Sequence, residues 1–423
     1  MGACLNTHQE HVVSARARER ARLARWLLLP LAIQAGLVLA AAENEQRGFV
    51  IQAGEQLVLD DNLYRLPDSI VVDEALLGAE GSRDDLVSRT SAAVLGRWAQ
   101  GRQTFAMSVG VDANRFQQNE RLDNTSRSAQ ASWEWGLGRR WSGRIGGDYQ
   151  RSLSGFGSNR SLERDLFESV NYFGELEYRL LARWSLTGRL RQSEGSHDSI
   201  TRRADDLDST TAAAGLVYRT VEGDEIGVEY RRVEAEYPQQ VIFAGQLFDR
   251  NYTENGASAR FRYTPSAKTY IEGSAGRLER DYPQGSIGDF SGNVWNASLR
   301  WLPGLKTRIS ASGWKELKAY LDTEADHFVA RGGKVSADWA ATRKLSFSVQ
   351  YSDETQRYIG DSLLVPTAMA RRDRVRTQQV AASFAPRDYV SLDLSWRFEQ
   401  RESNAWLYAY DDRIALLGLR FTF

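Results

Sequence analysis

The last twelve residues, Asp412 to Phe423, read Asp-Arg-Ile-Ala-Leu-Leu-Gly-Leu-Arg-Phe-Thr-Phe. Counting back from the terminus, apolar residues occupy every second position: Phe423, Phe421, Leu419, Leu417 and Ala415. Side chains two residues apart share one face of an extended strand, so this stretch predicts an amphipathic β-strand. A strand that ends a chain leaves an open edge unless another strand pairs with it. We therefore expect it to close a ring by pairing with the first strand of the mature chain; the last strand of a soluble sandwich is the alternative.

The same alternation recurs along the chain in runs of about ten residues, the length that a tilted membrane strand needs. The first run is expected at about Gly48 to Leu59, and a late one carries Leu392, Leu394 and Trp396 between polar neighbours. A strand ending in Phe resembles the C-terminal strand that bacterial outer-membrane proteins present to their assembly machinery. The resemblance marks Phe421 and Phe423 as the assembly signal, and we expect Phe423 to face lipid.

The connections between these runs fall into two classes. Eight very short turns, such as Gln100-Gly101-Arg102 and Pro303-Gly304-Leu305, recur roughly every 41 residues and alternate with longer polar loops, the layout of an outer-membrane barrel. Eight short turns join sixteen strands, and the first and last strands add two. The sequence thus predicts an all-β, transmembrane, antiparallel up-and-down barrel of about eighteen strands over residues 43–423, with sixteen as the alternative count.

Aromatic residues gather beside the short turns, where an interfacial girdle is expected. Ordinary strand propensity explains their presence but not their common level. The set comprises Trp98, Trp141, Trp184, Tyr218, Tyr263, Tyr270, Trp301, Trp339, Phe384 and Tyr389.

The N-terminus has the order of a secretory signal peptide. Five arginines between Arg16 and Arg25 precede the apolar run Trp26 to Leu39, which ends in Ala40-Ala41-Ala42. We predict a cleaved signal over residues 1–42, with export through the Sec pathway and a mature chain starting at Glu43; a retained anchor is the alternative. The apolar run is too short to span a bilayer comfortably.

Composition agrees with an exported barrel and excludes other classes. The only cysteine, Cys4, lies in the predicted signal, so the mature chain has no disulfide. Removing five Arg and two Glu leaves 49 basic and 53 acidic residues, a formal charge of −4, which gives no basic footprint for nucleic acid. The mature chain also has no apolar run of about 18 residues, so no transmembrane helix is expected.

The interior of such a barrel is expected to be wet and charged. Either opposite charges simply pair across strands, or the charged side chains form a selective path for hydroxyl-rich or anionic solutes. The residues expected to face the lumen are Arg144, Arg189, Arg191, Arg231, Arg260, Arg262, Arg300, Arg308, Asp393 and Arg397. A further cluster, Arg371, Arg372, Arg374 and Arg376, is expected at the end of an outer loop, where lipopolysaccharide phosphates are an alternative partner.

One segment breaks the alternation directly after the first strand. It comprises Asp60, Asp61, Asn62, Leu63, Tyr64, Arg65 and Leu66, followed by Pro67 and Asp68. Asp and Asn favour turns, and Pro67 cannot donate to a strand ladder. We expect residues 60–85 to fold into the lumen or onto its rim, with Arg65 paired to an acidic wall residue. Tyr64 would then offer a ring to a sugar in a gating role; a structural latch on the edge of the first strand is the alternative.

The signal peptide, the motif Asp61 to Leu66 and the arginine-rich barrel together resemble the EpsL family of outer-membrane proteins from exopolysaccharide biosynthesis clusters, within the wider β-barrel porin group. The resemblance covers the mature chain in layout, with the motif Asp61 to Leu66 as its specific part, and implies a role in polysaccharide export. It implies exopolysaccharide and periplasmic polysaccharide-export proteins as partners, beside outer-membrane lipid, lipopolysaccharide and the barrel assembly machinery, and a role in biofilm.

Three functions stay open from the sequence. The first is a polysaccharide-conducting channel in the bacterial outer membrane, the second a general or solute-uptake porin, and the third a non-conducting anchor for matrix polysaccharide or the biosynthetic complex. No enzyme, metal or cofactor is expected: the mature chain has two histidines, His197 and His327, both beside predicted outer loops, and no metal-ligand spacing or phosphate loop.

Overall fold

The computed structural model describes residues 47–70, 81–157, 162–239, 241–243, 246–283, 289–319, 327–359 and 370–423. The compact unit that contains them is Arg47–Phe423. The predicted signal peptide lies outside the described residues, so its cleavage stays a prediction. The helices in the described part of the chain are short turns, and none is long and apolar enough to cross a membrane.

Eighteen strands in the described residues form one continuous antiparallel sheet. Its first nine strands are β1 (Arg47–Asp60), β2 (Asp85–Gln100), β3 (Gln103–Phe116), β4 (Asn124–Leu137), β5 (Trp141–Leu153), β6 (Leu166–Arg179), β7 (Trp184–His197), β8 (Leu207–Arg219) and β9 (Glu225–Glu236). The other nine are β12 (Tyr252–Ser266), β13 (Thr269–Asp281), β14 (Phe290–Trp301), β15 (Thr307–Ala319), β16 (His327–Ala340), β17 (Leu345–Ile359), β18 (Arg372–Arg387), β19 (Val390–Ser403) and β20 (Tyr410–Thr422).

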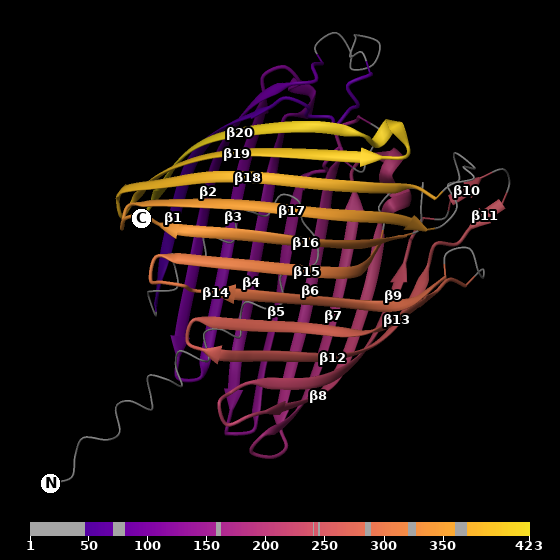
Figure 1. The fold of residues 1–423 in the computed structure, drawn as a ribbon. Coiled ribbons are helices and arrows are strands. Elements are labelled where there is room, and N and C mark those ends of the chain that lie inside the picture. The colour runs from indigo at the N-terminus through magenta and orange to yellow at the C-terminus, as the bar shows by residue number, and fades with distance from the viewer. Residues whose placement is uncertain are drawn as a thin grey trace. The chain divides into compact units, whose positions relative to one another are not determined.

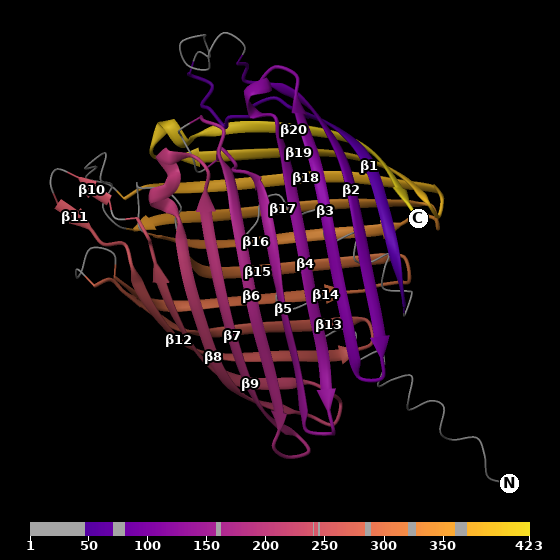
Figure 2. The ribbon, with the colours of Figure 1, turned by 180° about the vertical axis from the view of Figure 1, so that it is seen from behind.

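The connections hold the remaining elements. A small separate hairpin, β10 (Val241–Phe243) with β11 (Gln246–Phe248), lies between β9 and β12. Within the described ranges there are three short 3-10 turns, η3 (Glu120–Leu122), η4 (Ile200–Asp205) and η5 (Trp406–Tyr408). All of them lie in the long connections. Both views show these connections at one end of the barrel and the C-terminus at the other (Figures 1 and 2).

The sheet closes on itself because β1 pairs with both β2 and β20. At the very end of the chain, the Ile51 amide donates to the Phe423 carbonyl at 2.9 Å and the Phe423 amide donates to the Ile51 carbonyl at 2.8 Å. The predicted closure by the last strand is therefore confirmed, and the count is eighteen rather than sixteen. A closed barrel leaves no strand edge unpaired, which explains why an amphipathic strand can end the chain.

The outer face of the barrel is apolar across its middle. Phe49, Ile51, Leu394 and Leu417 are all exposed, although large apolar side chains are usually buried in a soluble protein. On a closed sheet whose alternate positions are polar, such a band is the surface that a bilayer covers. Exposed rings next to the short turns include Trp98, Trp141, Trp184, Trp301 and Trp339.

A second level of exposed rings lies nearer the long loops and includes Tyr172, Tyr230, Trp295, Tyr351 and Trp396. Beyond them the outward positions turn charged, as at Arg127, Arg277 and Asp353. The two aromatic levels thus mark the limits of the apolar band, as interfacial girdles do.

Candidate functional site: the lumenal wall

The inward positions of the strands carry the polar side chains. All ten residues expected in the lumen occupy inward positions, because each alternates along its strand with the residues that form the outward face. For example, Asp393 lies between the outward Leu392 and Leu394, and Arg262 lies between Phe261 and Tyr263. The wall is therefore built by the period-2 alternation of the strands themselves.

A row of contacts crosses the wall from β6 to β13 at the end of the barrel that carries the short turns. We call it the lower row. Arg219 Nη1 donates to Glu177 Oε1 at 2.5 Å, and its Nε donates to Glu225 Oε1 at 2.7 Å. Glu225 Oε2 accepts from Arg262 Nη1 at 2.8 Å, and Arg262 Nε donates to the Tyr270 hydroxyl at 2.9 Å. These distances are those of charge-assisted hydrogen bonds, so the side chains of the lower row are held in place.

Tyr270 continues the lower row, because its hydroxyl donates to Glu272 Oε2 at 2.8 Å. The assignment of Tyr270 to the aromatic girdle is therefore wrong. Tyr270 is the second residue of β13 and directly precedes the outward Ile271. The strand alternation therefore turns its ring toward the lumen. The Arg300 guanidinium lies 5.2 Å from its centroid, a cation–π contact.

An upper row runs parallel to the lower one and is looser. Arg144 lies 3.9 Å from Glu134. Arg189 lies 3.5 Å from Glu175 and 3.6 Å from Glu229, and Arg260 reaches the same Glu229 at 3.4 Å. Most of these separations exceed a hydrogen-bond length, so the guanidinium donors keep capacity for water or a polar solute.

A third group lies toward the long loops, where Arg231 Nη2 donates to Glu254 Oε1 at 2.5 Å and Arg280 Nη2 donates to Glu254 Oε2 at 2.8 Å. Glu254 and Arg280 are buried, so this group is fixed like the lower row. In all three groups carboxylates and guanidinium groups alternate, and the wall they form is charged but nearly balanced.

Two of the expected lumenal cations differ from the rest. Within the described residues, Arg191 and Arg308 form no ion pair, although Arg308 lies in register with Asp338 on the neighbouring strand. They are the members of the predicted set whose charge is least neutralised by the wall.

On the other side of the lumen, Asp393 accepts from Arg420 Nη2 at 2.7 Å and from the Ser383 hydroxyl at 2.6 Å. Arg397 forms an ion pair with Glu399, whose other oxygen accepts from the Tyr410 hydroxyl at 2.8 Å. These groups join β18, β19 and β20 next to the closing seam.

Sequence reasoning missed several members of the wall, including Glu177, Arg219, Glu225 and Arg280. Arg219 and Glu225 flank the short turn Glu222-Gly223-Asp224, and they could have been placed inward because Tyr218 and Ile226 beside them are apolar. The contact from Arg219 to Glu177, which spans a whole intervening strand, has no signal in the sequence.

The segment after β1 docks at the outer end of the closing seam. Arg65 lies 3.1 Å from Asp60 and 3.0 Å from Asp412, which is on β20. Burial alone lowers the pKa of Arg65, but the two carboxylates outweigh it and raise that pKa above its ordinary value. Asn62 Nδ2 also donates to the Leu66 carbonyl at 2.9 Å and to the Asp411 carbonyl at 2.7 Å. The segment therefore ties the first strand to the last one.

Tyr64 belongs to a small apolar core at this end of the barrel. The core contains Tyr64, Leu66, Val87, Phe116, Leu122 and Phe156. The Tyr64 ring packs on Phe156 with centroids 4.7 Å apart, and its hydroxyl donates to Asn119 Oδ1 at 2.8 Å. Burial raises the pKa of that hydroxyl. The side chain is 0% exposed, so the interpretation of Tyr64 as a ring offered to a sugar is wrong.

The arginine cluster at the start of β18 splits between the two faces of the wall. Arg371 Nη2 donates to Asp373 Oδ2 at 2.8 Å and its guanidinium lies 3.2 Å from the Tyr408 centroid. Arg374 pairs with Asp353 at 2.6 Å and Arg376 with Glu402 at 2.9 Å. Arg372 to Arg376 lie within the strand rather than in the loop, because the alternation continues beyond the apolar band.

The two histidines contact groups other than serine. His197 Nδ1 lies 3.1 Å from Asp206 and its Nε2 lies 3.9 Å from Asp165. His327 lies 3.3 Å from the Tyr282 hydroxyl. In the part of the chain that the structure describes, no group of His, Cys, Asp and Glu side chains is arranged to hold a metal ion.

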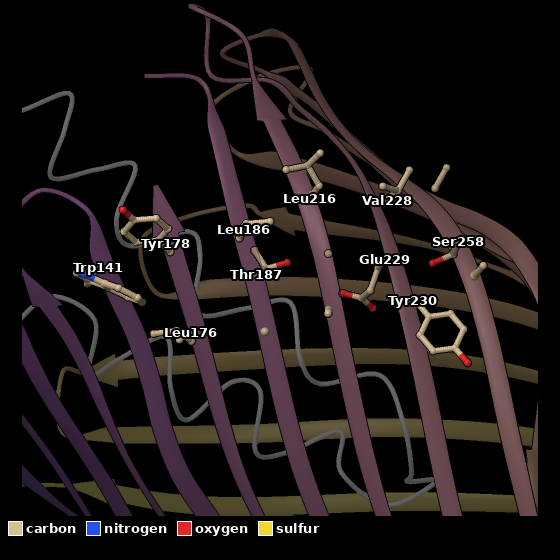
Figure 3. A pocket seen from close by; sticks show the side chains of 15 residues that line it. Trp141, Leu176, Tyr178, Leu186, Thr187, Leu216, Val228, Glu229, Tyr230 and Ser258 are labelled. Carbon is tan, nitrogen blue, oxygen red and sulfur yellow. The ribbon is translucent and has the colours of Figure 1, made fainter. Parts of the chain in front are cut away.

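A separate groove of about 920 Å³ crosses β5, β6, β7, β8, β9 and β12 (Figure 3). Its walls are mostly outward residues such as Trp141, Leu176, Leu186 and Val228, all exposed, and its floor contains Gly188 and Ala214. The groove is thus a depression in the apolar outer face and lies outside the lumenal wall.

Comparison with known proteins adds a family match to this geometry. Residues 272–423 match the family described as "Putative beta-barrel porin 2". The matched residues include almost all of strands β13 to β20. No curated protein matches the chain.

Several solved structures are also similar at low identity. OccK2 (OpdF) of Pseudomonas aeruginosa has a TM-score of 0.48 at 11% identity, covering 89% of this chain and 98% of that one. A BenF-like porin from Pseudomonas fluorescens Pf-5 has 0.47 at 11%, covering 88% and 98%. OccK9 (OpdG) of Pseudomonas aeruginosa has 0.45 at 12%, covering 89% and 98%.

Proposed function

We propose that this chain is a passive diffusion channel for small hydrophilic solutes in the bacterial outer membrane. The observation that carries the proposal is the lumenal wall, in which rows of paired arginines and carboxylates line the inside of an eighteen-stranded barrel. Barrels of this strand number enclose an aqueous channel when nothing plugs them. An arrangement of this kind stabilises water and polar solutes along the path without binding one ion tightly.

The proposed topology follows from the two kinds of connection. The short turns and the C-terminus lie on the periplasmic side, and the long loops lie outside the cell, as in outer-membrane barrels generally. Sec export, cleavage of residues 1–42 and insertion by the barrel assembly machinery through Phe421 and Phe423 belong to the same proposal.

The test is conductance in planar bilayers with the purified, refolded barrel. Discrete current steps that scale with salt concentration are the expected result. A folded barrel, identified by its heat-modifiable band, that inserts and passes no current would refute the channel and leave the non-conducting anchor.

Passage of an exopolysaccharide is the second candidate, and it is supported by the motif Asp61 to Leu66 and its resemblance to the EpsL family. Added polysaccharide of the producing strain should block the current reversibly if the polymer enters the lumen. If small neutral sugars pass through the barrel and the polymer does not change the current, the solute channel is favoured. Periplasmic polysaccharide-export proteins are partners only under the second candidate.

A further inference from the structure

A basic pocket of about 490 Å³ lies at the outer ends of four neighbouring strands. Four arginines line it: Arg115 near the end of β3, Arg127 on β4, Arg151 on β5 and Arg164 just before β6. Asp123 is the one carboxylate among the lining residues. The pocket therefore has a surplus of positive charge, in contrast to the balanced lumenal wall.

The pocket opens on the outer face of the barrel. Arg127 and Arg151 lie directly opposite each other in the β4–β5 register, and on the same face the register continues through the pairs Ala129–Tyr149 and Ala131–Gly147. The next pair on this face is Trp133–Ile145, and Ile145 is exposed in the apolar band.

The level of the pocket matches the edge of the membrane. Ten residues separate Arg151 from Trp141 at the other end of β5. At about 3.3 Å per residue and a tilt of roughly 40°, they span about 25 Å of height, the usual height of the apolar band. The arginines thus lie where the headgroups of the outer leaflet are expected, with an apolar wall directly beneath them.

The guanidinium groups in the pocket are only loosely neutralised. Arg115 lies 3.6 Å from Asp123. Arg151 and Arg164 share Asp198 at 3.7 and 3.8 Å, and Arg151 lies 4.0 Å from Glu168. All of these separations are longer than a hydrogen bond.

Arg127 stands out among the four. It has no ion pair within the described residues, is exposed, and faces another arginine across the strand pair. Like charges directly opposite each other destabilise a sheet, and an anion between them would relieve the repulsion. By contrast, the outward Arg374 and Arg376 of β18 each have a close carboxylate partner, so basic residues at this level are not unpaired in general.

We propose that this pocket binds a phosphate group of a phosphorylated glycolipid in the outer leaflet, the headgroup chemistry of lipid A. Guanidinium groups match phosphate oxygens in paired hydrogen bonds, and four of them converge here. The acyl chains of the same lipid would lie on the small and apolar residues below, among them Val111, Ala129, Ala131 and Gly147. Free phosphate lacks that second contact.

The proposal is tested with the full barrel in detergent, using native mass spectrometry to titrate bisphosphorylated lipid A. We expect the protein to bind lipid A, the double variant Arg127→Gln/Arg151→Gln to bind at least tenfold more weakly, and dephosphorylated lipid A to bind the unaltered barrel equally weakly. Arg277→Gln is the matched control, because it removes an outward arginine at a comparable level whose partner is Glu279, and it should leave lipid A binding unchanged.

The single variant Arg127→Gln controls for misfolding of the double variant, because it breaks no ion pair among the described residues. We expect it to give a normal heat-modifiable band and weakened lipid A binding. Equal binding by the folded double variant, or by dephosphorylated lipid A, would overturn the proposal. So would a site that takes inorganic phosphate while lipid A fails to bind.

Discussion

At the scale of single residues, the contacts of the segment after β1 favour one of its two expected roles. Tyr64 is enclosed by Phe156 and by the hydrogen bond to Asn119, and Arg65 joins Asp60 to Asp412 across the seam. The Arg65 contacts join β1 to β20, and the Tyr64 contacts pack the segment against the connections that follow β3 and β5. They support the latch, because a residue that gates solute flow by touching solute has to be exposed.

The first prediction follows from that enclosure. Tyr64→Ala should lower the free energy of unfolding by about 3–5 kcal/mol, since it leaves a cavity in the apolar core that Leu66 and Phe116 share. Urea unfolding in detergent or lipid measures it. Tyr64→Phe is the control and should cost much less, because only the hydroxyl contacts are lost. Altered single-channel conductance in a fully stable Tyr64→Ala barrel would restore the gating role.

The second prediction concerns Arg65. Arg65→Ala should destabilise the barrel by roughly 3–5 kcal/mol, because removal of one partner leaves the buried Asp412 carboxylate without its counter-charge. A second substitution, Asp412→Asn, should recover part of the loss by removing that carboxylate. If Asp412→Asn made the loss larger in the Arg65→Ala background, the pairing would not be the source of the effect.

A third prediction separates the two faces of β19. Leu394 is 58% exposed on the apolar outer face, so Leu394→Arg should cost about 2–4 kcal/mol if the position lies near the bilayer midplane. Ser395→Arg, which faces the lumen one residue later, should cost little. Asp393 is a poorer control than its position alone indicates, because an arginine there would face Arg420. Unfolding free energies of the two variants that agree within error would mean that this strand is not in a membrane.

At the scale of elements, the closing strand depends on its last residue in two ways. The Phe423 backbone forms two hydrogen bonds with Ile51, while its ring is 70% exposed on the outer face. Backbone and ring can therefore be tested separately.

The fourth prediction uses this separation. Deletion of Phe423 should reduce the folded, heat-modifiable band strongly, because it removes both the backbone pair and the assembly signal. Phe423→Ala keeps the backbone pair and should reduce assembly in cells while leaving refolding in detergent nearly normal. Unchanged yield from the deletion in cells would show that the last residue has no part in assembly.

At the scale of the whole molecule, the lumenal rows set the charge that a permeating ion meets. The lower row depends on Arg219, which neutralises Glu177 and Glu225 together. The fifth prediction is that Arg219→Gln shifts the reversal potential under a salt gradient toward cation selectivity, because two carboxylates lose their shared partner. Arg115→Gln, on the outer face, is the matched control and should leave the reversal potential unchanged.

The sequence by itself determined the barrel and the facing of most side chains, while it left eighteen and sixteen strands open until the structure showed eighteen. Period-2 alternation, eight short turns and the ending at Phe423 are local signals, and a closed sheet is the arrangement that satisfies all of them in a membrane. The inward placement of Arg189, Arg260 and Arg262 follows from the same alternation.

Only the tertiary structure decided which charges meet. Arg219 reaches Glu177 over β7, and Arg65 meets Asp412 nearly at the other end of the chain. These contacts depend on strand stagger and on the path of the connections, which no local period encodes. The basic pocket between β3 and β6 arises in the same way, because register alone places Arg127 opposite Arg151.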